Sequence, residues 1–195
     1  MIIGITGGIA SGKSLVSSKI KDLGFELHDC DLISHAIFET DTVQERLKDE
    51  FGFKGERVSR KDISSIVFSD EAKIKVLNNI IHPLILDELD RIIYNVSEDD
   101  LVFIDVPLLY ELKLEYLFDK IIFVYVDEEK QIERLKDRDR ISTSYAKEKI
   151  KKQIPMDIKK EHALKNKHFI IDNNSGLEEL YRKLDFILKE INNDF

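Results

Sequence analysis

The sequence has a single cysteine, no long apolar run and no excess of positive charge, and each absence excludes a class of protein. Cys30 is the only cysteine in 195 residues, so no internal disulfide can form. No apolar stretch approaches the roughly 20 residues that span a bilayer, and the amino-terminal residues lack the basic segment of a signal peptide. We therefore expect a cytoplasmic protein with no membrane partner.

The net charge of −8 argues against a general nucleic-acid-binding protein. The charge is uneven, because residues 130–168 hold 13 lysines and arginines against 6 aspartates and glutamates, a local charge of +7 that leaves −15 for the rest. This basic segment is either a solvated helical face or a flap that meets an anionic ligand. Nothing in the sequence indicates an obligate protein partner.

Short β-branched runs alternate with helical patterns along most of the chain, which predicts an α/β fold with a parallel sheet. Strands are expected at residues 2–6, 25–28, 101–105, 121–127 and 168–172. Helices are expected beside them at 14–23 and 177–191. The sequence contains no repeats, low-complexity stretches or long linkers.

Residues 31–96 interrupt this alternation, because the segment lacks a clear strand and holds helical stretches. These stretches lie near 42–51, 61–68, 71–80 and 83–94. We interpret the segment as a helical insertion at the edge of the sheet. A second helical excursion covers 127–138 and 142–154 and carries the basic excess.

The stretch GITGGIASGKS, residues 4–14, follows the first expected strand directly. Gly7, Gly12, Lys13 and Ser14 fit the pattern G-x-x-x-x-G-K-[ST] in a strand–turn–helix setting. Glycines let backbone N–H groups wrap around phosphates, and the helix N-terminus adds partial positive charge. Lys13 suits the β- and γ-phosphates, and the Ser14 hydroxyl suits Mg²⁺. We expect this P-loop to bind a nucleoside triphosphate with Mg²⁺ through Gly8, Ile9, Ala10, Ser11, Gly12, Lys13, Ser14 and Leu15.

A nucleotide site of this kind fits a small-molecule kinase or a nucleotide-driven switch. A GTPase switch should show Asp-x-x-Gly after its third strand, but Asp105 is followed by Val-Pro-Leu. It should also show Asn-Lys-x-Asp, but residues 166–169 read Asn-Lys-His-Phe. Both departures favour the kinase.

Phosphoryl transfer needs a residue that takes the proton of the acceptor. Asp29 and Asp31 follow the second expected strand, where functional groups of open α/β sheets collect, and either could instead cap a helix. Asp31 is the better candidate because it lies further into the expected loop. Asp105, at the end of a buried strand, could contact the ligand or the waters of Mg²⁺.

Several basic residues are candidates for binding the anionic substrates. Arg134, Arg138 and Arg140 crowd the start of the basic excursion, and arginine suits the charge on a transferring phosphoryl group. Surface ion pairs with neighbouring acidic residues are the alternative. His82 precedes Pro83, so it is either a substrate contact or only the residue before a helix, because proline favours the first helical position.

The ordered motifs resemble the dephospho-coenzyme A kinase family along nearly the whole chain. They are GITGGIASGKS, DCD at 29–31, IHPLI at 81–85, VPLLYE at 106–111, RLKDRD at 134–139 and IDNN at 171–174. The resemblance implies transfer of the ATP γ-phosphoryl group to the ribose 3′-hydroxyl of 3′-dephospho-CoA, giving CoA and ADP in the final step of CoA synthesis. The alternatives are a P-loop kinase for another small acceptor, such as a nucleoside monophosphate, and a non-enzymatic nucleotide-sensing module.

The resemblance also implies a fold like that of nucleoside monophosphate kinases. The core would be a five-stranded parallel sheet with helices on both faces, formed by residues 1–28, 100–127 and 167–195. Residues 29–99 would form a helical substrate-binding region, and residues 128–166 a helical lid.

Position by position, the resemblance implies that Asp31 is the general base and Arg138 the lid arginine. Lys13 and Ser14 match the phosphate and magnesium residues, and His82 falls at the His-Pro of the family. With Asp31 and His82, Arg134 and Arg140 complete the expected substrate-binding set.

Two P-loop positions depart from the family pattern, since Ala10 replaces a usual glycine and Leu15 a usual threonine. Ala10 fits if its φ is negative. Leu15 removes a hydroxyl that could touch the α-phosphate, so we expect a weaker affinity for ATP.

Overall fold

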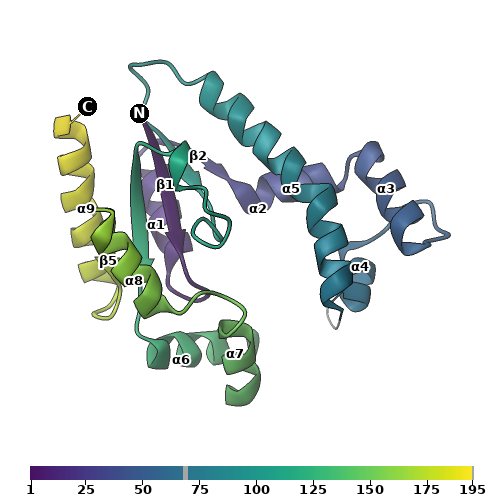
Figure 1. Ribbon diagram of the computed structural model, residues 1–195. Coiled ribbons are helices and arrows are strands. Elements are labelled where there is room, and N and C mark those ends of the chain that lie inside the picture. The colour runs from purple at the N-terminus through teal and green to yellow at the C-terminus, as the bar shows by residue number, and fades with distance from the viewer. Residues whose placement is uncertain (68–69, 195) are drawn as a thin grey trace. The chain divides into compact units, whose positions relative to one another are not determined.

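The computed structural model describes residues 1–67 and 70–194 and divides into two compact units. The first unit is Met1–Asp29 with Val96–Phe195, and the second is Cys30–Asn95. Figure 1 shows the sheet in the first unit and a purely helical arrangement in the second. Among the residues so described, no helix is both long enough and apolar enough to cross a membrane.

The first unit contains the expected five-stranded parallel sheet. Its strands are β1 (Ile2–Gly7), β2 (Glu26–Asp29), β3 (Val102–Asp105), β4 (Lys120–Tyr125) and β5 (Phe169–Asp172). Their order is β2-β3-β1-β4-β5, and all four pairings are parallel. In register, both Ile5 and Asp29 pair with Asp105, so the carboxyl ends of β1, β2 and β3 meet at one edge.

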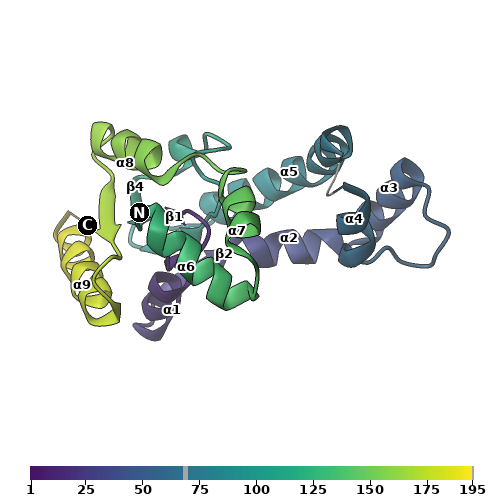
Figure 2. The same cartoon turned by 90° about the horizontal axis from the view of Figure 1, so that it is seen from below.

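Helices cover both faces of this sheet. The helices of this unit are α1 (Lys13–Asp22), α6 (Glu128–Asp139), α7 (Thr143–Ile150), α8 (Met156–Lys165) and α9 (Leu177–Asp194), with a short 3₁₀ turn at Glu115–Leu117. Figure 2 shows α1 and α9 on one side of the strands and α8 on the other. Apolar residues of α9 recur at helical spacing, at Leu180, Leu184 and Ile191, and belong to one buried cluster with residues of α1 and of the strands β1, β4 and β5. The α/β fold with helices on both faces is therefore confirmed.

The helix α8 was not expected as a separate element. Its inward face carries Lys159 between Met156 and Ala163, which breaks the apolar periodicity that marks an amphipathic helix. Lys159 is only 1% exposed, and its ammonium lies 2.6 Å from Glu111 Oε1. A buried ion pair thus replaces an apolar contact at this position.

The second unit consists of α2 (Cys30–Phe38), α3 (Asp41–Phe51), α4 (Arg60–Val67) and α5 (Glu71–Tyr94). The helix expected at 61–68 is α4, although Phe68 lies outside the described residues. Two expectations were wrong here. Asp31, expected in a loop after β2, lies in the first turn of the helix α2, and the two helices expected on either side of Pro83 are one.

Proline normally ends or kinks a helix because it lacks the backbone N–H. In α5, Ile80 and Ile81 before Pro83 and Leu89 after it are all buried, so packing on both sides holds the helix together. Asp70 caps its start by accepting hydrogen bonds from the N–H groups of Ala72 and Lys73.

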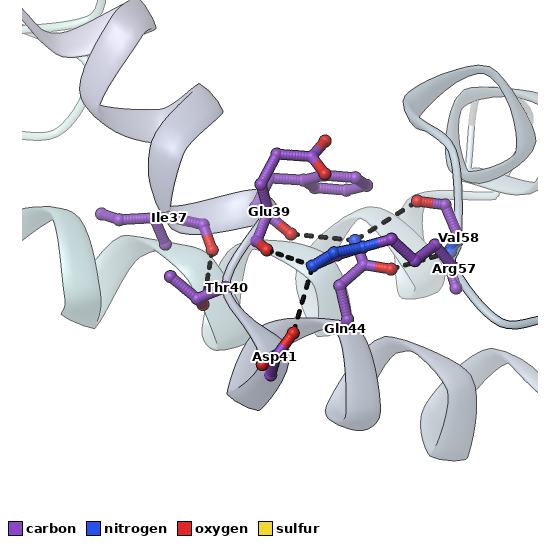
Figure 3. A network of polar contacts seen from close by, with 8 residues as sticks. Ile37, Glu39, Thr40, Asp41, Gln44, Arg57 and Val58 are labelled. Carbon is purple, nitrogen blue, oxygen red and sulfur yellow. Dashed lines mark hydrogen bonds and ion pairs between the residues drawn. The ribbon is translucent and has the colours of Figure 1, made fainter.

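A buried amide connects three parts of the second unit (Figure 3). Gln44 Nε2 donates to the carbonyls of Phe38, at 2.9 Å, and Val58, at 3.3 Å. Its Oε1 accepts from the N–H of Val58 at 2.7 Å. The Gln44 side chain, 3% exposed, thereby fixes the end of α2 to the segment before α4.

Replacing Gln44 with leucine should lower the free energy of unfolding by about 2 to 3 kcal/mol, because buried backbone groups of Phe38 and Val58 lose their partners. Urea denaturation followed by circular dichroism measures this loss. The nearby exposed ion pair of Arg57 with Asp41 supplies the control, since Asp41→Asn should change stability by less than about 0.5 kcal/mol. Equal effects of the two substitutions would contradict this role of Gln44.

Candidate active site

The P-loop lies between the end of β1 at Gly7 and the start of α1 at Lys13. Gly12 is the N-cap residue of α1, with φ of 95°, and no side chain caps this helix terminus. A Cβ at Gly12 would collide with the Asn173 amide, and one at Gly8 with the Met156 sulfur. Gly12 therefore needs glycine for its positive φ, whereas a side chain at Gly8 would force the Met156 side chain to move. The uncapped terminus leaves the first N–H groups of α1 available to an anion.

Ala10 does not meet the condition of a negative φ under which an alanine would fit here. Its φ is 59°, in the left-handed region that costs an L-residue about 1–2 kcal/mol. The loop turns tightly here, since the N–H of Ser11 donates to the carbonyl of Gly8 at 3.1 Å. The usual glycine of the family would adopt this conformation without the steric cost.

Side chains distant in the sequence hold the P-loop backbone. The N–H of Ile9 donates to Gln153 Oε1 at 2.8 Å, and Gln131 Nε2 donates to the carbonyl of Ile9 at 2.7 Å. Asn173 Nδ2 donates to the carbonyl of Ser11 at 2.8 Å. Asn173 belongs to the IDNN motif singled out in the sequence, whereas neither glutamine belongs to any of the motifs.

Arg134 is placed against the same loop. Its guanidinium donates to the carbonyl of Asn173 at 2.9 Å and to that of Ser11 at 3.4 Å. Arg134 therefore supports the P-loop, and its expected contact with substrate stays a prediction.

The Lys13 ammonium forms an ion pair with Asp105, which is only 3% exposed. Ser17 Oγ donates to the second carboxylate oxygen at 2.6 Å. Asp29 pairs in register with Asp105, so two carboxylates end neighbouring strands at this edge. Asp105 was expected near the ligand or the waters of Mg²⁺, and here it orients the P-loop lysine.

The residues around the start of α1 fit a Mg²⁺ ion that is held mainly by phosphate oxygens and water. Within the described ranges, no group of three or more His, Cys, Asp or Glu side chains could hold a metal ion alone. Ser14 is exposed at the second position of α1 and offers a hydroxyl oxygen. Mg²⁺ typically takes one or two protein ligands and keeps several waters, so this sparse donor set suits it.

The remaining arginines of the basic segment lie on its surface. Arg138 Nε donates to Asp139 at 2.8 Å, and Lys149 Nζ donates to the same carboxylate at 2.8 Å. These hydrogen bonds lower the pKa of Asp139 to about 2. Arg140 is exposed at the end of α6. The surface ion pair considered for Arg138 is thus present, but such exposed pairs contribute little, so Arg138 can exchange it for a phosphate.

In the second unit, Asp31 is exposed in the first turn of α2, two residues after β2 ends. His82 is half-buried inside α5, and this burial lowers its pKa. Arg60 begins α4 with its guanidinium 5.2 Å from the centre of the Phe38 ring. Burial lowers the pKa of Arg60, while the carboxylates of Glu39 and Asp31 act in the opposite direction.

Arg60 is a residue that sequence reasoning missed, because a single arginine at the start of a short helix carries no motif. Its electrostatic interaction with Asp31 places a positive charge in the surroundings of the expected base.

Sequence comparisons with known proteins agree on one family. The profile of the dephospho-CoA kinase family matches residues 1–179. The dephospho-CoA kinase of Fusobacterium nucleatum is 38% identical over 189 residues, covering 95% of each chain. That of Oceanobacillus iheyensis is 38% identical over 199 residues, covering 98% of each.

Solved structures show the same fold. The dephospho-CoA kinase from Campylobacter jejuni matches with a TM-score of 0.69 and 28% identity, covering 97% of this chain and 96% of that one. A shikimate kinase from Acinetobacter baumannii shares the fold alone, with a TM-score of 0.54 and 15% identity over 99% of this chain and 93% of that one. The match along residues 1–179 and the nearly complete coverage of the relatives show that the chain belongs to the dephospho-CoA kinase family.

Proposed function

We propose that the protein transfers the γ-phosphoryl group of ATP to the ribose 3′-hydroxyl of dephospho-CoA, giving CoA and ADP. The observation that carries this proposal is the family match along nearly the whole chain, with Lys13 and the uncapped start of α1 in the P-loop. ATP and dephospho-CoA are thus the proposed substrates, and the cytosolic location stays a prediction from the sequence.

The P-loop would bind the triphosphate through backbone N–H groups and Lys13. The Lys13 ammonium would leave Asp105 for the β- and γ-phosphates, and the Ser17 hydroxyl would remain as a donor to Asp105. Ser14 would hold Mg²⁺, which, when bound, neutralises charge on the phosphate oxygens. The exposed Arg138 and Arg140 would approach the transferring phosphoryl group from the lid.

Asp31 would accept the proton of the 3′-hydroxyl as the phosphoryl group transfers. This role is supported by the family motif, by its exposure in the first turn of α2, and by the interaction with Arg60. His82, whose pKa is lowered, would be neutral near pH 7 and would contact the substrate as a hydrogen-bonding group.

Mixing the protein with ATP, Mg²⁺ and dephospho-CoA and separating the products by chromatography tests the proposal directly. Formation of CoA together with ADP is the expected result. Transfer to AMP but not to dephospho-CoA would instead identify a nucleoside monophosphate kinase. ATP binding without transfer to any acceptor would identify a nucleotide-sensing module.

Leu15 allows a separate prediction about ATP affinity. It lies in the first turn of α1 with 42% of its surface exposed, so a threonine fits there without repacking. Leu15→Thr should lower the Kd for ATP about fivefold, because the hydroxyl adds roughly 1 kcal/mol of hydrogen bonding to the phosphates. Titration calorimetry measures this change, and Leu15→Val, which has the same shape without the hydroxyl, is the matched control. Equal affinities of the two variants would contradict the prediction.

A further inference from the structure

Amide side chains hold both polar groups of the Ile9 backbone, and the proposed chemistry uses neither amide. Gln153, in the connection between α7 and α8, accepts from the N–H of Ile9 at 2.8 Å. Gln131, on α6, donates to its carbonyl at 2.7 Å. The Ile9 backbone therefore cannot rotate without breaking contacts to two segments of the expected lid.

The Gln131 side chain is buried where it donates its hydrogen bond to Ile9. Its side chain is 2% exposed, and its Oε1 has no hydrogen-bond partner among the residues that the structure describes. Burying an amide whose oxygen is unpaired is unfavourable. The bond from Nε2 to Ile9 is thus the polar contact that this buried side chain makes with the P-loop.

The residue that follows Ile9 is the strained one. Ala10 has a φ of 59°, which a non-glycine residue keeps only where its surroundings fix it. On its other side, the N–H of Ser11 donates to Gly8 and the carbonyl of Ser11 accepts from Asn173. The Ile9 and Ala10 side chains also pack against Leu135, Ala146 and Ile150 of α6 and α7. The Gln131 and Gln153 bonds therefore belong to the set of contacts that fixes the left-handed conformation.

This conformation matters for anion binding. Backbone that passes through left-handed residues becomes concave, so that successive N–H groups point to one centre. Ala10 and Gly12 are the two left-handed residues of the P-loop. If Ala10 relaxed to a negative φ, the concave surface would have to be rebuilt whenever ATP binds, and the apparent affinity would fall.

We propose that Gln131 and Gln153 are positioning residues that keep Ala10 left-handed, and that Gln153 couples the α7–α8 connection to the shape of the phosphate-binding loop. The proposal rests on the proposed function in so far as the P-loop binds ATP. It assigns to the lid a second effect besides closing over substrate, because displacing Gln153 loosens the loop itself.

A double-mutant cycle between Gln153 and Ala10 tests the proposal. Gln153→Leu keeps the volume but removes the acceptor, and it should raise the Kd for ATP with Mg²⁺ about tenfold. Glycine adopts positive φ without steric cost, so in an Ala10→Gly background the same substitution should raise the Kd less than threefold. The four Kd values are measured by titration calorimetry, and a thermal unfolding curve for each variant establishes that it is folded. Gln153→Ala, measured in the same two backgrounds, replaces Gln153→Leu if leucine prevents folding.

Two results would overturn the proposal. An equal loss of affinity with Ala10 present and in the Ala10→Gly background would mean that Gln153 acts independently of the left-handed conformation. No loss with Ala10 present would mean that the Gln153 bond does not support the loop. CoA formation by the unsubstituted protein is measured in parallel. Absence of CoA would show that the proposed reaction is wrong, whereas CoA formation with either of the two results above would show that only the proposed role of Gln153 is wrong.

Discussion

Replacing Asp31 with asparagine should slow CoA formation about 10³-fold, while the Kd for ATP changes less than threefold. Asparagine has the same shape but cannot take the proton of the 3′-hydroxyl, and general bases typically contribute 10²- to 10⁴-fold. Because the Asp31 side chain is exposed, its replacement should not unfold the protein, so the lower rate would reflect the transfer step. Single-turnover measurement of CoA with saturating ATP and dephospho-CoA isolates the transfer step, and titration calorimetry gives the affinity for ATP.

The matched control is Glu39→Gln. Glu39 and Asp31 both interact electrostatically with Arg60, so each substitution removes one negative charge from the surroundings of the same arginine. If Asp31 acted only through this charge, the two substitutions would lower the rate of CoA formation equally. If Asp31 accepts the proton, the rate of the Glu39→Gln variant should stay within about threefold of that of the unsubstituted protein.

Asp29→Asn tests the remaining alternative for the base. Asp29 ends β2 and pairs in register with Asp105, so it is the other carboxylate that the sequence offered. If Asp29→Asn greatly lowered the rate of CoA formation while Asp31→Asn left it near normal, Asp29 would be the general base.

The strands β1, β3 and β4 were predictable because they are buried along nearly their whole length and therefore read as continuous apolar runs. Phe103, Ile122 and Val124 are completely buried, and their segments were expected within one or two residues of the observed bounds. The order of the strands was not predicted, because an apolar run does not specify its neighbours in the sheet.

The errors in the second unit arose where tertiary packing outweighs a local rule. Pro83 predicted a break, but the packing of Ile81 and Leu89 on either side keeps α5 continuous. The start of α2 follows β2 with no intervening turn, so Asp31 was expected in a loop although it lies in the first helical turn.

The P-loop was recognisable because its pattern is contiguous in the sequence, but the contacts that hold it are not. Ile9 meets Gln131 and Gln153 across 122 and 144 residues of chain, and no spacing rule connects such partners. The positive φ of Ala10 was not predicted either, since an alanine considered by its local sequence alone favours negative φ.

Replacing Lys13 with methionine should lower the rate of CoA formation about 10³-fold and raise the Kd for ATP about tenfold. Lys13 is the side chain of the P-loop that carries charge to the β- and γ-phosphates, and removing such a stabilising group costs 10²- to 10³-fold in related chemistry. Methionine keeps the length of the side chain without the ammonium. Rates with varied ATP separate the effect on KM from that on kcat.

The same substitution should also destabilise the protein, and this second effect must be separated from the first. Asp105 is buried, so loss of the Lys13 ammonium leaves its carboxylate with the Ser17 hydroxyl as the one hydrogen-bond donor among the residues that the structure describes. An unpaired buried charge costs about 3 kcal/mol, which lowers the Tm of a protein of this size by roughly 6 to 12 °C.

The double variant Lys13→Met with Asp105→Asn separates the two effects. Asparagine removes the unpaired charge and still accepts from Ser17, so the Tm should return to within about 3 °C of the unsubstituted protein. The rate of CoA formation should stay about 10³-fold low, because the charge that stabilises the phosphates is still absent. Recovery of the rate together with the Tm would show that Lys13 serves only to neutralise Asp105, and the role of the P-loop lysine in transfer would have to be abandoned.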